Sequence, residues 1–277
     1  MVRLFATPEA LVAEKAGAFL RLRTQTGLDA LFDADDPVAL VGQWLADADA
    51  IPGPAPTTLR APIQNQEIWA AGVTYLRSMR ARMQEAKDAG GGDFYDRVYA
   101  AERPELFFKG TPNRVAAPGT PVHIRADSKW NVPEPELTLA INRRGRIFGY
   151  TVGNDMSSRD IEGQNPLYLP QAKTYDRSAA LGPCLVVTNE LPGPDTHIVL
   201  EIRRAGAAVF NGETQVKNIK RPLPSLAEWL FRENTFLHGA YLMTGTGIVP
   251  ADTFTLQAGD EIRITIDGIG TLINPVD

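Results

Sequence analysis

Two acidic residues stand at a spacing that favours a shared cation. Glu134 and Glu136 flank Pro135, which fixes its own φ and pushes Glu134 into an extended conformation. Residues two apart in an extended chain point to the same side, so the two carboxylates project together, with Cα atoms about 6.5–7 Å apart. Carboxylates this close repel each other unless a proton or a cation lies between them.

Asp155 is a candidate third ligand. It follows a predicted strand over 146–152, and a hairpin joining this strand to one predicted over 137–142 would bring Asp155 within reach of both glutamates. Three carboxylates without a Cys or His ligand select a hard cation, Mg²⁺ or Mn²⁺ before Ca²⁺. On spacing alone, three unrelated surface acids are the alternative interpretation.

Two other charged residues could move protons. Lys173 lies in a weakly charged segment, and a lysine beside a metal can have a lowered pKa and act as a base or an electrostatic clamp. Glu105 is flanked by aromatic residues, which raise the pKa of a carboxyl group and suit it to proton transfer. The alternatives are a surface lysine and a glutamate that pairs with Arg103 or Lys109.

Candidate substrate contacts carry less specific signals. Thr246 lies in the compact turn 244–247 (Thr-Gly-Thr-Gly), whose N–H groups and hydroxyls could hold a carboxylate. Arg77 is a second candidate. Arg159 is expected mainly to pair with Asp160, with substrate contact as the alternative.

The charge pattern argues against nucleic-acid binding. The formal net charge is -5, and no basic stripe of the kind that binds phosphates occurs. The basic cluster Arg77, Arg80 and Arg82 is interrupted by Glu85 and Asp88, which indicates a solvated helix face. The partner that remains is a small molecule.

Other classes of protein are disfavoured by what the sequence lacks. Cys184 is the single cysteine, so no intrachain disulfide can form and a reducing compartment fits. There is neither a signal-peptide core nor a run of about 18 apolar residues, so we expect a cytoplasmic protein without a membrane span. The three histidines are scattered, and neither a Gly-x-Ser-x-Gly elbow nor a phosphate-binding glycine loop is present.

The 277 residues predict a strand-rich α+β fold. Amphipathic patterns beginning at Thr7-Pro8 and Asp36-Pro37 predict two helices, and the prolines between 51 and 63 predict a stiff linker. The predicted division is thus a small helical N-terminal region with its linker, 1–63, and a catalytic domain, 64–277. Within the latter, strands are expected over 68–73, 121–126, 137–142, 146–152, 185–187, 198–203 and 261–267, and helices over 76–87 and 224–238. The helix over 76–87 beside the triple glycine 90–92 could form a movable lid, with a surface loop as the alternative.

Taken together, these segments resemble the fumarylacetoacetate hydrolase superfamily over roughly 65 to 277. The glutamate pair, followed by Asn-Asp-x-Ser-x-Arg-Asp, carries the most specific part of the match. The matching segments are 72–75, 104–109, 134–137, 149–160, Lys173, 181–183, 211–213, 244–246 and 259–260. The resemblance implies a mixed β-sheet roll with Mg²⁺ (Mn²⁺ as the alternative) on Glu134, Glu136 and Asp155, in homodimers or dimers of dimers. It also makes Tyr75 a candidate substrate contact.

Within the superfamily, segments 165–173 and 244–250 look like the sugar-acid dehydratase branch. Hydrolase members activate water with a histidine from the lid region, and 76–103 contains no histidine. The resemblance therefore implies a dehydratase that acts on a 2-keto-3-deoxy sugar acid, a pentonate giving 2,5-dioxopentanoate. Lys173 or Glu105 would take a C3 proton, and the other would help the C4 hydroxyl to leave. The alternatives are a hydrolase that cleaves a C–C bond of an acylpyruvate or 2,4-diketo acid, and a non-catalytic binder of 2-oxo acids.

Overall fold

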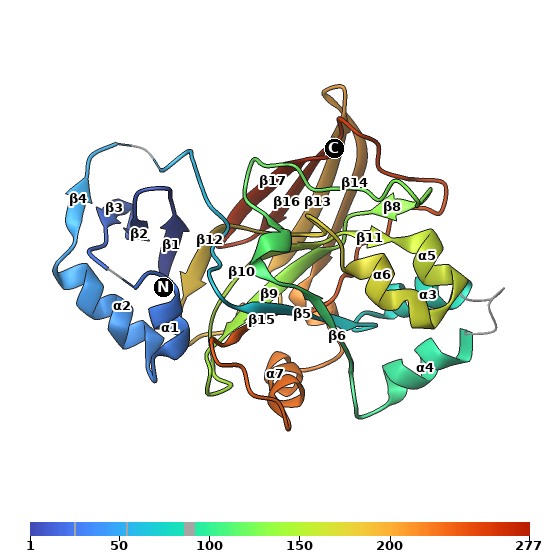
Figure 1. The fold of residues 1–277 in the computed structure, drawn as a ribbon, viewed down its shortest axis with the longest axis horizontal. Coiled ribbons are helices and arrows are strands. Elements are labelled where there is room, and N and C mark those ends of the chain that lie inside the picture. The colour runs from blue at the N-terminus through green and yellow to red at the C-terminus, as the bar shows by residue number, and fades with distance from the viewer. Residues whose placement is uncertain (25, 54, 86–91) are drawn as a thin grey trace.

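The computed structural model of the protein describes residues 1–24, 26–53, 55–85 and 92–277. In these ranges, eleven strands form one large mixed sheet, in the order β4-β3-β2-β1-β12-β10-β9-β15-β5-β6 with β7 beside β12 (Figure 1). Its strands are β1 (Val2–Ala6), β2 (Leu11–Lys15), β3 (Ala18–Arg21), β4 (Asp49–Ile51), β5 (Glu67–Gly72), β6 (Glu105–Gly110), β7 (Val115–Ala116), β9 (Pro135–Ile141), β10 (Ile147–Asp155), β12 (Ala179–Val187) and β15 (Ala240–Met243).

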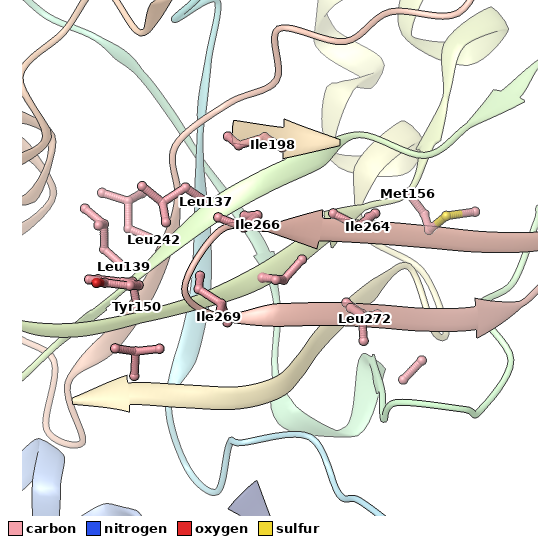
Figure 2. Packing of buried hydrophobic residues seen from close by; sticks show 14 of the residues in the cluster. Leu137, Leu139, Tyr150, Met156, Ile198, Leu242, Ile264, Ile266, Ile269 and Leu272 are labelled. Carbon is pink, nitrogen blue, oxygen red and sulfur yellow. The ribbon is translucent and has the colours of Figure 1, made fainter. Parts of the chain in front are cut away.

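A second sheet packs against this one. It has the order β14-β13-β16-β17 and comprises β13 (His197–Arg204), β14 (Ala207–Gln215), β16 (Glu261–Ile266) and β17 (Gly270–Pro275). The main core lies between β9 and β10 on one side and β16 and β17 on the other, where Leu137, Leu139 and Tyr150 meet Ile264 and Leu272 (Figure 2). A separate short pair is formed by β8 (Asn131–Val132) and β11 (Ser157–Ser158).

Helices lie around the sheets (Figure 1), and Phe32 of the first helix packs on Phe148 and Tyr241 of the large sheet. They are α1 (Asp29–Asp33), α2 (Pro37–Ala46), α3 (Leu76–Glu85), α4 (Gly92–Ala100), α5 (Arg159–Gln164), α6 (Leu169–Lys173) and α7 (Leu223–Phe231), with short 3₁₀ turns η1 (Pro112–Arg114), η2 (Pro166–Tyr168) and η3 (Val216–Asn218). The helix α3 confirms the one predicted over 76–87 as far as Glu85. Gly90 and Gly91 lie outside the described residues, and Gly92 begins α4.

The prediction of a purely helical N-terminal region is wrong in its first half. The segment after Thr7 forms the antiparallel strands β2 and β3, joined by a tight turn in which Ala16 and Gly17 have φ of 50° and 81°. The hydroxyl of Thr7 accepts the N–H of Ala10, 3.1 Å away, and so closes a turn rather than starting a helix. The strand β1 pairs with β12 on one side and with β2 on the other, and this pairing stabilises an extended chain at β2. A local helical pattern contains no information about such a partner.

The second N-terminal helix is confirmed. The carboxylate of Asp36 accepts the N–H of Ala39 at 2.9 Å, and Pro37 occupies the first turn of α2. Because β1 pairs with β12, the N-terminal strands continue the large sheet. The division of the chain at residue 63 stays a prediction.

Most of the other expected strands are present, with shifted ends. The strand expected over 121–126 is absent; in that segment Val122 makes one isolated bridge, to Val276. The N–H of Val122 bonds to the carbonyl of Pro275 at 2.9 Å, whereas the N–H of His123 points the other way and bonds to the carbonyl of Arg177 at 3.2 Å. The strands β6, β14, β15 and β17 were not predicted.

Candidate active site

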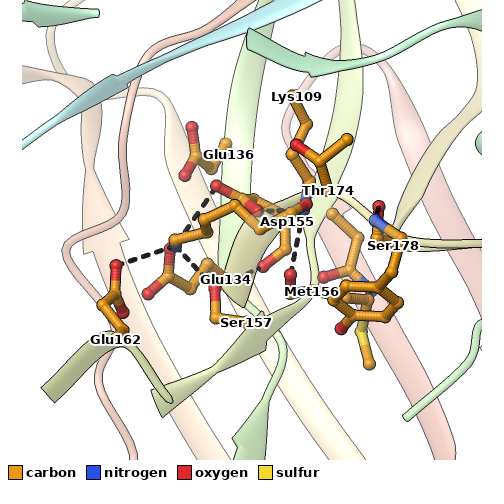
Figure 3. A network of polar contacts seen from close by, with 12 residues as sticks. Lys109, Glu134, Glu136, Asp155, Met156, Ser157, Glu162, Thr174 and Ser178 are labelled. Carbon is orange, nitrogen blue, oxygen red and sulfur yellow. Dashed lines mark hydrogen bonds and ion pairs between the residues drawn. The ribbon is translucent and has the colours of Figure 1, made fainter. Parts of the chain in front are cut away.

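The hairpin of β9 and β10 brings the three predicted metal ligands together. Glu134 and Asp155 lie opposite each other and exchange main-chain hydrogen bonds, Asp155 N–H to Glu134 O at 2.9 Å and Glu134 N–H to Asp155 O at 3.2 Å. Gly153 is the partner of Glu136 in the ladder. The three side chains each offer a carboxylate oxygen, and these oxygens all lie within 4.8 Å of one another. Glu134, Glu136 and Asp155 thus form one buried cluster (Figure 3).

The charge balance of this cluster suits a hard divalent cation. Burial, together with the carboxylates of Asp155 and Glu134, raises the pKa of Glu136 well above its usual value. One oxygen of Glu136 accepts the N–H of Gly245 at 2.5 Å, which holds the side chain in place. A cation bound by all three carboxylates would relieve their repulsion, and oxygen ligands without sulfur or nitrogen match Mg²⁺ or Mn²⁺.

Lys173 reaches the edge of the cluster. Its Nζ lies 2.6 Å from Glu134 Oε2, 3.4 Å from Asp155 Oδ2 and 2.6 Å from Ser157 Oγ. Burial by itself lowers the pKa of Lys173, but the attraction of Asp155, Glu134 and Glu162 outweighs burial, and the net pKa lies above the usual value. The lysine is therefore a buried cation in contact with two of the three metal-ligand carboxylates.

The sequence-based prediction missed Lys109, which holds the same cluster from behind. Its Nζ pairs with Asp155 Oδ1 at 2.6 Å and donates to the carbonyl of Met156 at 2.9 Å and to that of Lys173. The side chain of Lys109 is completely buried. Glu105, Phe107 and Lys109 alternate along β6, and this period of two was the signal that could have placed Lys109 beside Glu105 on one face.

The structure corrects the interpretation of two arginines. Arg159 does not pair with Asp160: its guanidinium donates to Glu134 Oε1 at 2.8 Å, whereas Asp160 accepts from Ser128 Oγ at 2.5 Å and from the N–H of Lys129 at 2.7 Å. Arg82 does not lie on a solvated helix face, because it is buried and ion-paired with Glu162. A helix whose exposed face carries Arg77 and Arg80 can still turn a third arginine inward.

A small cavity lies against the carboxylates. It measures about 20 Å³. Its lining includes the three ligands, Arg159, Lys173, Thr246, Gly245, and Ser78 and Arg82 from α3. Thr246 is thus in the site, where its hydroxyl accepts the N–H of Ile248 at 3.2 Å. The predicted contribution of Arg159 and Thr246 to the site is consistent with this position, although substrate contact itself stays a prediction.

Comparisons with known proteins decide the family. The profile described as fumarylacetoacetate (FAA) hydrolase, C-terminal, matches residues 67–277. The chain belongs to the fumarylacetoacetate hydrolase family. A probable 2-keto-3-deoxyxylonate dehydratase of Haloferax volcanii is 48% identical over 216 residues, which cover 78% of this chain and 73% of the relative. The 2-dehydro-3-deoxy-D-arabinonate dehydratase of Saccharolobus solfataricus is 42% identical over 218 residues, which cover 78% of this chain and 73% of that relative.

A solved structure extends this likeness to the whole chain. It is a 2-keto-3-deoxy-D-arabinonate dehydratase complexed with magnesium and 2,5-dioxopentanoate, which superposes with a TM-score of 0.82 at 32% identity and covers 100% of this chain and 98% of that one. The fumarylacetoacetate hydrolase fold therefore includes the N-terminal strands of this chain. None of the helices in the described part of the chain has the length and hydropathy needed to cross a membrane.

Glu105 lies beside this family site rather than in its cavity. Its carboxyl group is buried, one oxygen has no hydrogen-bond partner, and burial raises its pKa. A Cβ at Gly72 would lie 2.1 Å from Glu105 Oε2, so Gly72 leaves the space that this carboxyl group occupies. The adjacent Val73 has a φ of 54°, a left-handed conformation that a β-branched residue adopts only where its surroundings hold it.

Tyr75 and Arg77 lie on the outer side of the site. Both line a cavity of about 680 Å³ between α3 and the loop 247–252. Tyr75 is buried and its hydroxyl has no hydrogen-bond partner, whereas the exposed Arg77 donates to the carbonyl of Val249 at 2.8 Å. The structure does not bring Arg77 into the cavity of the carboxylates, and its role in substrate binding stays a prediction.

Replacing Lys109 by Met is expected to destabilise the fold. The substitution removes the charge that pairs with Asp155 and leaves two main-chain carbonyls without their donor. Removal of one member of a buried ion pair costs about 3–5 kcal/mol of unfolding free energy. Urea denaturation in the presence of EDTA measures the loss, with Lys129→Met on the surface as the matched control. An unchanged midpoint for Lys109→Met would contradict a supporting role.

Proposed function

We propose that the protein is a magnesium-dependent dehydratase that converts a 2-keto-3-deoxypentonate into 2,5-dioxopentanoate and water. The observation that carries this proposal is the buried triad of Glu134, Glu136 and Asp155 with Lys173 at its edge, in a chain that matches a dehydratase complexed with magnesium and this product along its whole length. The curated relatives named as 2-keto-3-deoxy-pentonate dehydratases support the same reaction.

The triad would hold the metal through its carboxylate oxygens. When bound there, Mg²⁺ makes the C3 protons of the substrate acidic by drawing electron density from the 2-oxo group. A divalent cation on the triad would repel the ammonium of Lys173, which lies next to two of the ligands, and would so favour its neutral amine; in this proposal that amine takes the C3 proton. Loss of the C4 hydroxyl then leaves a C3–C4 double bond, and transfer of hydrogen from C5 to C3 and from the C5 hydroxyl to C4 gives the aldehyde.

Glu105 would supply the acid for this elimination. Burial favours the neutral form of its carboxyl group, which is the form that can donate a proton to a leaving hydroxide. Arg159 and Thr246 line the cavity beside the three carboxylates and are proposed contacts for the substrate's carboxylate and hydroxyl groups. Tyr75 is a proposed contact on the outer wall.

The same residues argue against hydrolysis of a C–C bond. Hydrolysis requires a base beside the scissile bond to activate water. The histidine that serves as this base in hydrolase members is missing, because the sequence 76–103, which includes α3 and α4, contains no histidine. Elimination needs no attacking water. We also propose that the enzyme works in the cytoplasm as a homodimer or a dimer of dimers, which light scattering of the purified protein would test.

The direct test is a substrate panel. We expect a semialdehyde product from at least one stereoisomer of 2-keto-3-deoxypentonate with Mg²⁺, loss of activity in EDTA, and recovery on addition of Mg²⁺ or Mn²⁺. Acylpyruvates and 2,4-diketo acids serve as the comparison, followed through their enol absorbance. Release of pyruvate from a diketo acid, without product from any deoxypentonate, would replace the dehydratase by the hydrolase.

A further inference from the structure

The cavity is too small for the proposed substrate. Its volume of about 20 Å³ gives room for about one water molecule, which needs about 10–15 Å³ of such volume. A five-carbon acid can therefore reach the carboxylates only if one wall of the cavity moves. Five of its lining residues lie on strands β5, β6, β9 and β10 of the large sheet, and Arg159 and Lys173 come from the short helices α5 and α6.

The helix α3 contributes Ser78 and Arg82 to the wall. With α4 it packs around a small apolar cluster of its own, formed by Val73, Met79 and Tyr95 and separate from the two main cores. A segment with few contacts to the main core opens at a low free-energy cost. The α3–α4 pair is thus the wall that can move.

The ends of this pair are fastened to one turn of the chain. Tyr75, just before α3, forms a bridge with Ile219. At the C-terminal end of α4, the carbonyls of Val98 and Ala101 accept hydrogen bonds from Arg221, at 2.8 and 2.9 Å. Residues 219 and 221, close together in the chain, therefore hold both ends of the α3–α4 pair. A movement of the pair would rotate the inner face of α3 about these two attachment points.

An ion pair links the inner face of α3 to α5. Arg82 on α3 pairs with Oε1 of Glu162 on α5, and both side chains are buried. The same oxygen, Oε1, lies 3.9 Å from Lys173 Nζ, and Figure 3 shows Glu162 on the far side of Ser157 from Lys109. A single carboxylate oxygen therefore stands between a cation on the mobile wall and the amine at the metal-ligand cluster.

We propose that Glu162 is a positioning residue that couples closure of α3 to the placement of Lys173; this inference rests on the proposed dehydratase function. With α3 closed, Glu162 shares its charge between Arg82 and Lys173, which leaves Lys173 directed at Glu134 and the reacting carbon. With α3 open, Arg82 withdraws, and Glu162, no longer fixed by Arg82, ceases to hold Lys173 beside Glu134. Proton removal then proceeds only when the wall has closed over the substrate and excluded water.

Three variants and their combination test the coupling. Glu162→Gln keeps the shape but removes the charge, so we expect kcat to fall about 100-fold, with Mg²⁺ affinity unchanged. Glu162→Asp should recover part of kcat. Arg82→Gln should mainly raise KM, because the closed state is less populated. Because Glu162→Gln already removes the link between Arg82 and Lys173, the double variant of Glu162→Gln with Arg82→Gln should have the kcat of Glu162→Gln within about twofold.

Hydrogen exchange of the Mg²⁺-loaded protein supplies a readout that needs no turnover. We expect faster exchange in α3 for Glu162→Gln and Arg82→Gln, with β9 and β10 unchanged, and wild-type behaviour for the control Arg80→Gln on the exposed face of α3. A kcat for Glu162→Gln within about threefold of wild type, or losses that multiply in the double variant, would overturn the inference. A wild-type protein inactive on every deoxypentonate would instead refute the proposed function, while exchange in α3 would still report on the Arg82–Glu162 contact.

Discussion

Glu136→Gln is expected to abolish Mg²⁺ binding and activity while leaving the fold intact. The glutamine has the same shape, but it removes one of three carboxylates whose oxygens lie within 4.8 Å of one another. Since loss of a residue that merely supports a metal ligand weakens binding about 10–100-fold, loss of a ligand should exceed about 100-fold. Calorimetric titration with Mg²⁺ measures the affinity directly.

Thermal unfolding gives an independent readout of the same variant. A ligand at about 100 times its dissociation constant stabilises a protein by about 2.7 kcal/mol, so Mg²⁺ should raise the Tm of the wild type but not that of Glu136→Gln. In EDTA the variant should be at least as stable as the wild type, because Glu136 is crowded by Asp155 and Glu134. The exposed Glu190→Gln is the control. A normal response of Glu136→Gln to Mg²⁺ would place the metal elsewhere.

Lys173→Met is expected to have the opposite combination of effects, with loss of turnover and retention of the metal. Removal of a group that transfers a proton typically lowers kcat about 10²- to 10⁴-fold. The affinity for Mg²⁺ should rise, because the ammonium 2.6 Å from Glu134 and 3.4 Å from Asp155 repels a second cation. Steady-state kinetics and Mg²⁺ titration of one preparation measure both quantities.

The fall in kcat and the rise in Mg²⁺ affinity must occur together to support the role of Lys173 in proton transfer. Lys217→Met, which removes a surface ion pair with Asp195, is the matched control and should alter neither quantity. A Lys173→Met protein that keeps its wild-type kcat would show that another residue takes the proton. A protein that loses Mg²⁺ together with activity would show that Lys173 organises the ligands rather than the reaction.

Local sequence signals predicted the fold best where the partner of a segment is close in the chain. The hairpin of β9 and β10 was anticipated from two apolar runs with a short connection, and the start of α2 from Asp36 and Pro37. The segment 11–21 was predicted as a helix but forms strands, because its pairing begins from β1, whose other neighbour is the distant β12. Such long-range partners leave no local trace.

The functional site shows the same contrast. Glu134 and Glu136 could be placed on one side of an extended chain from Pro135 and the strand period alone, and the expected hairpin made Asp155 a candidate third ligand. The family resemblance then favoured these ligands and Lys173 over unrelated surface residues. Arg82 was misjudged, because its burial depends on a partner, Glu162, that lies on another helix. Lys109 was overlooked as a site residue, because its partner Asp155 is on a different strand.

The sequence by itself determined the chemistry available to this protein: three carboxylates, one lysine and no histidine near them, and hence a hard cation and proton transfer in a fumarylacetoacetate hydrolase fold. The tertiary structure alone decided which cations neutralise which carboxylates and which wall closes the cavity. The physical reason is that ion pairing and burial depend on distances between segments far apart in the chain, whereas residue type and strand period are local properties.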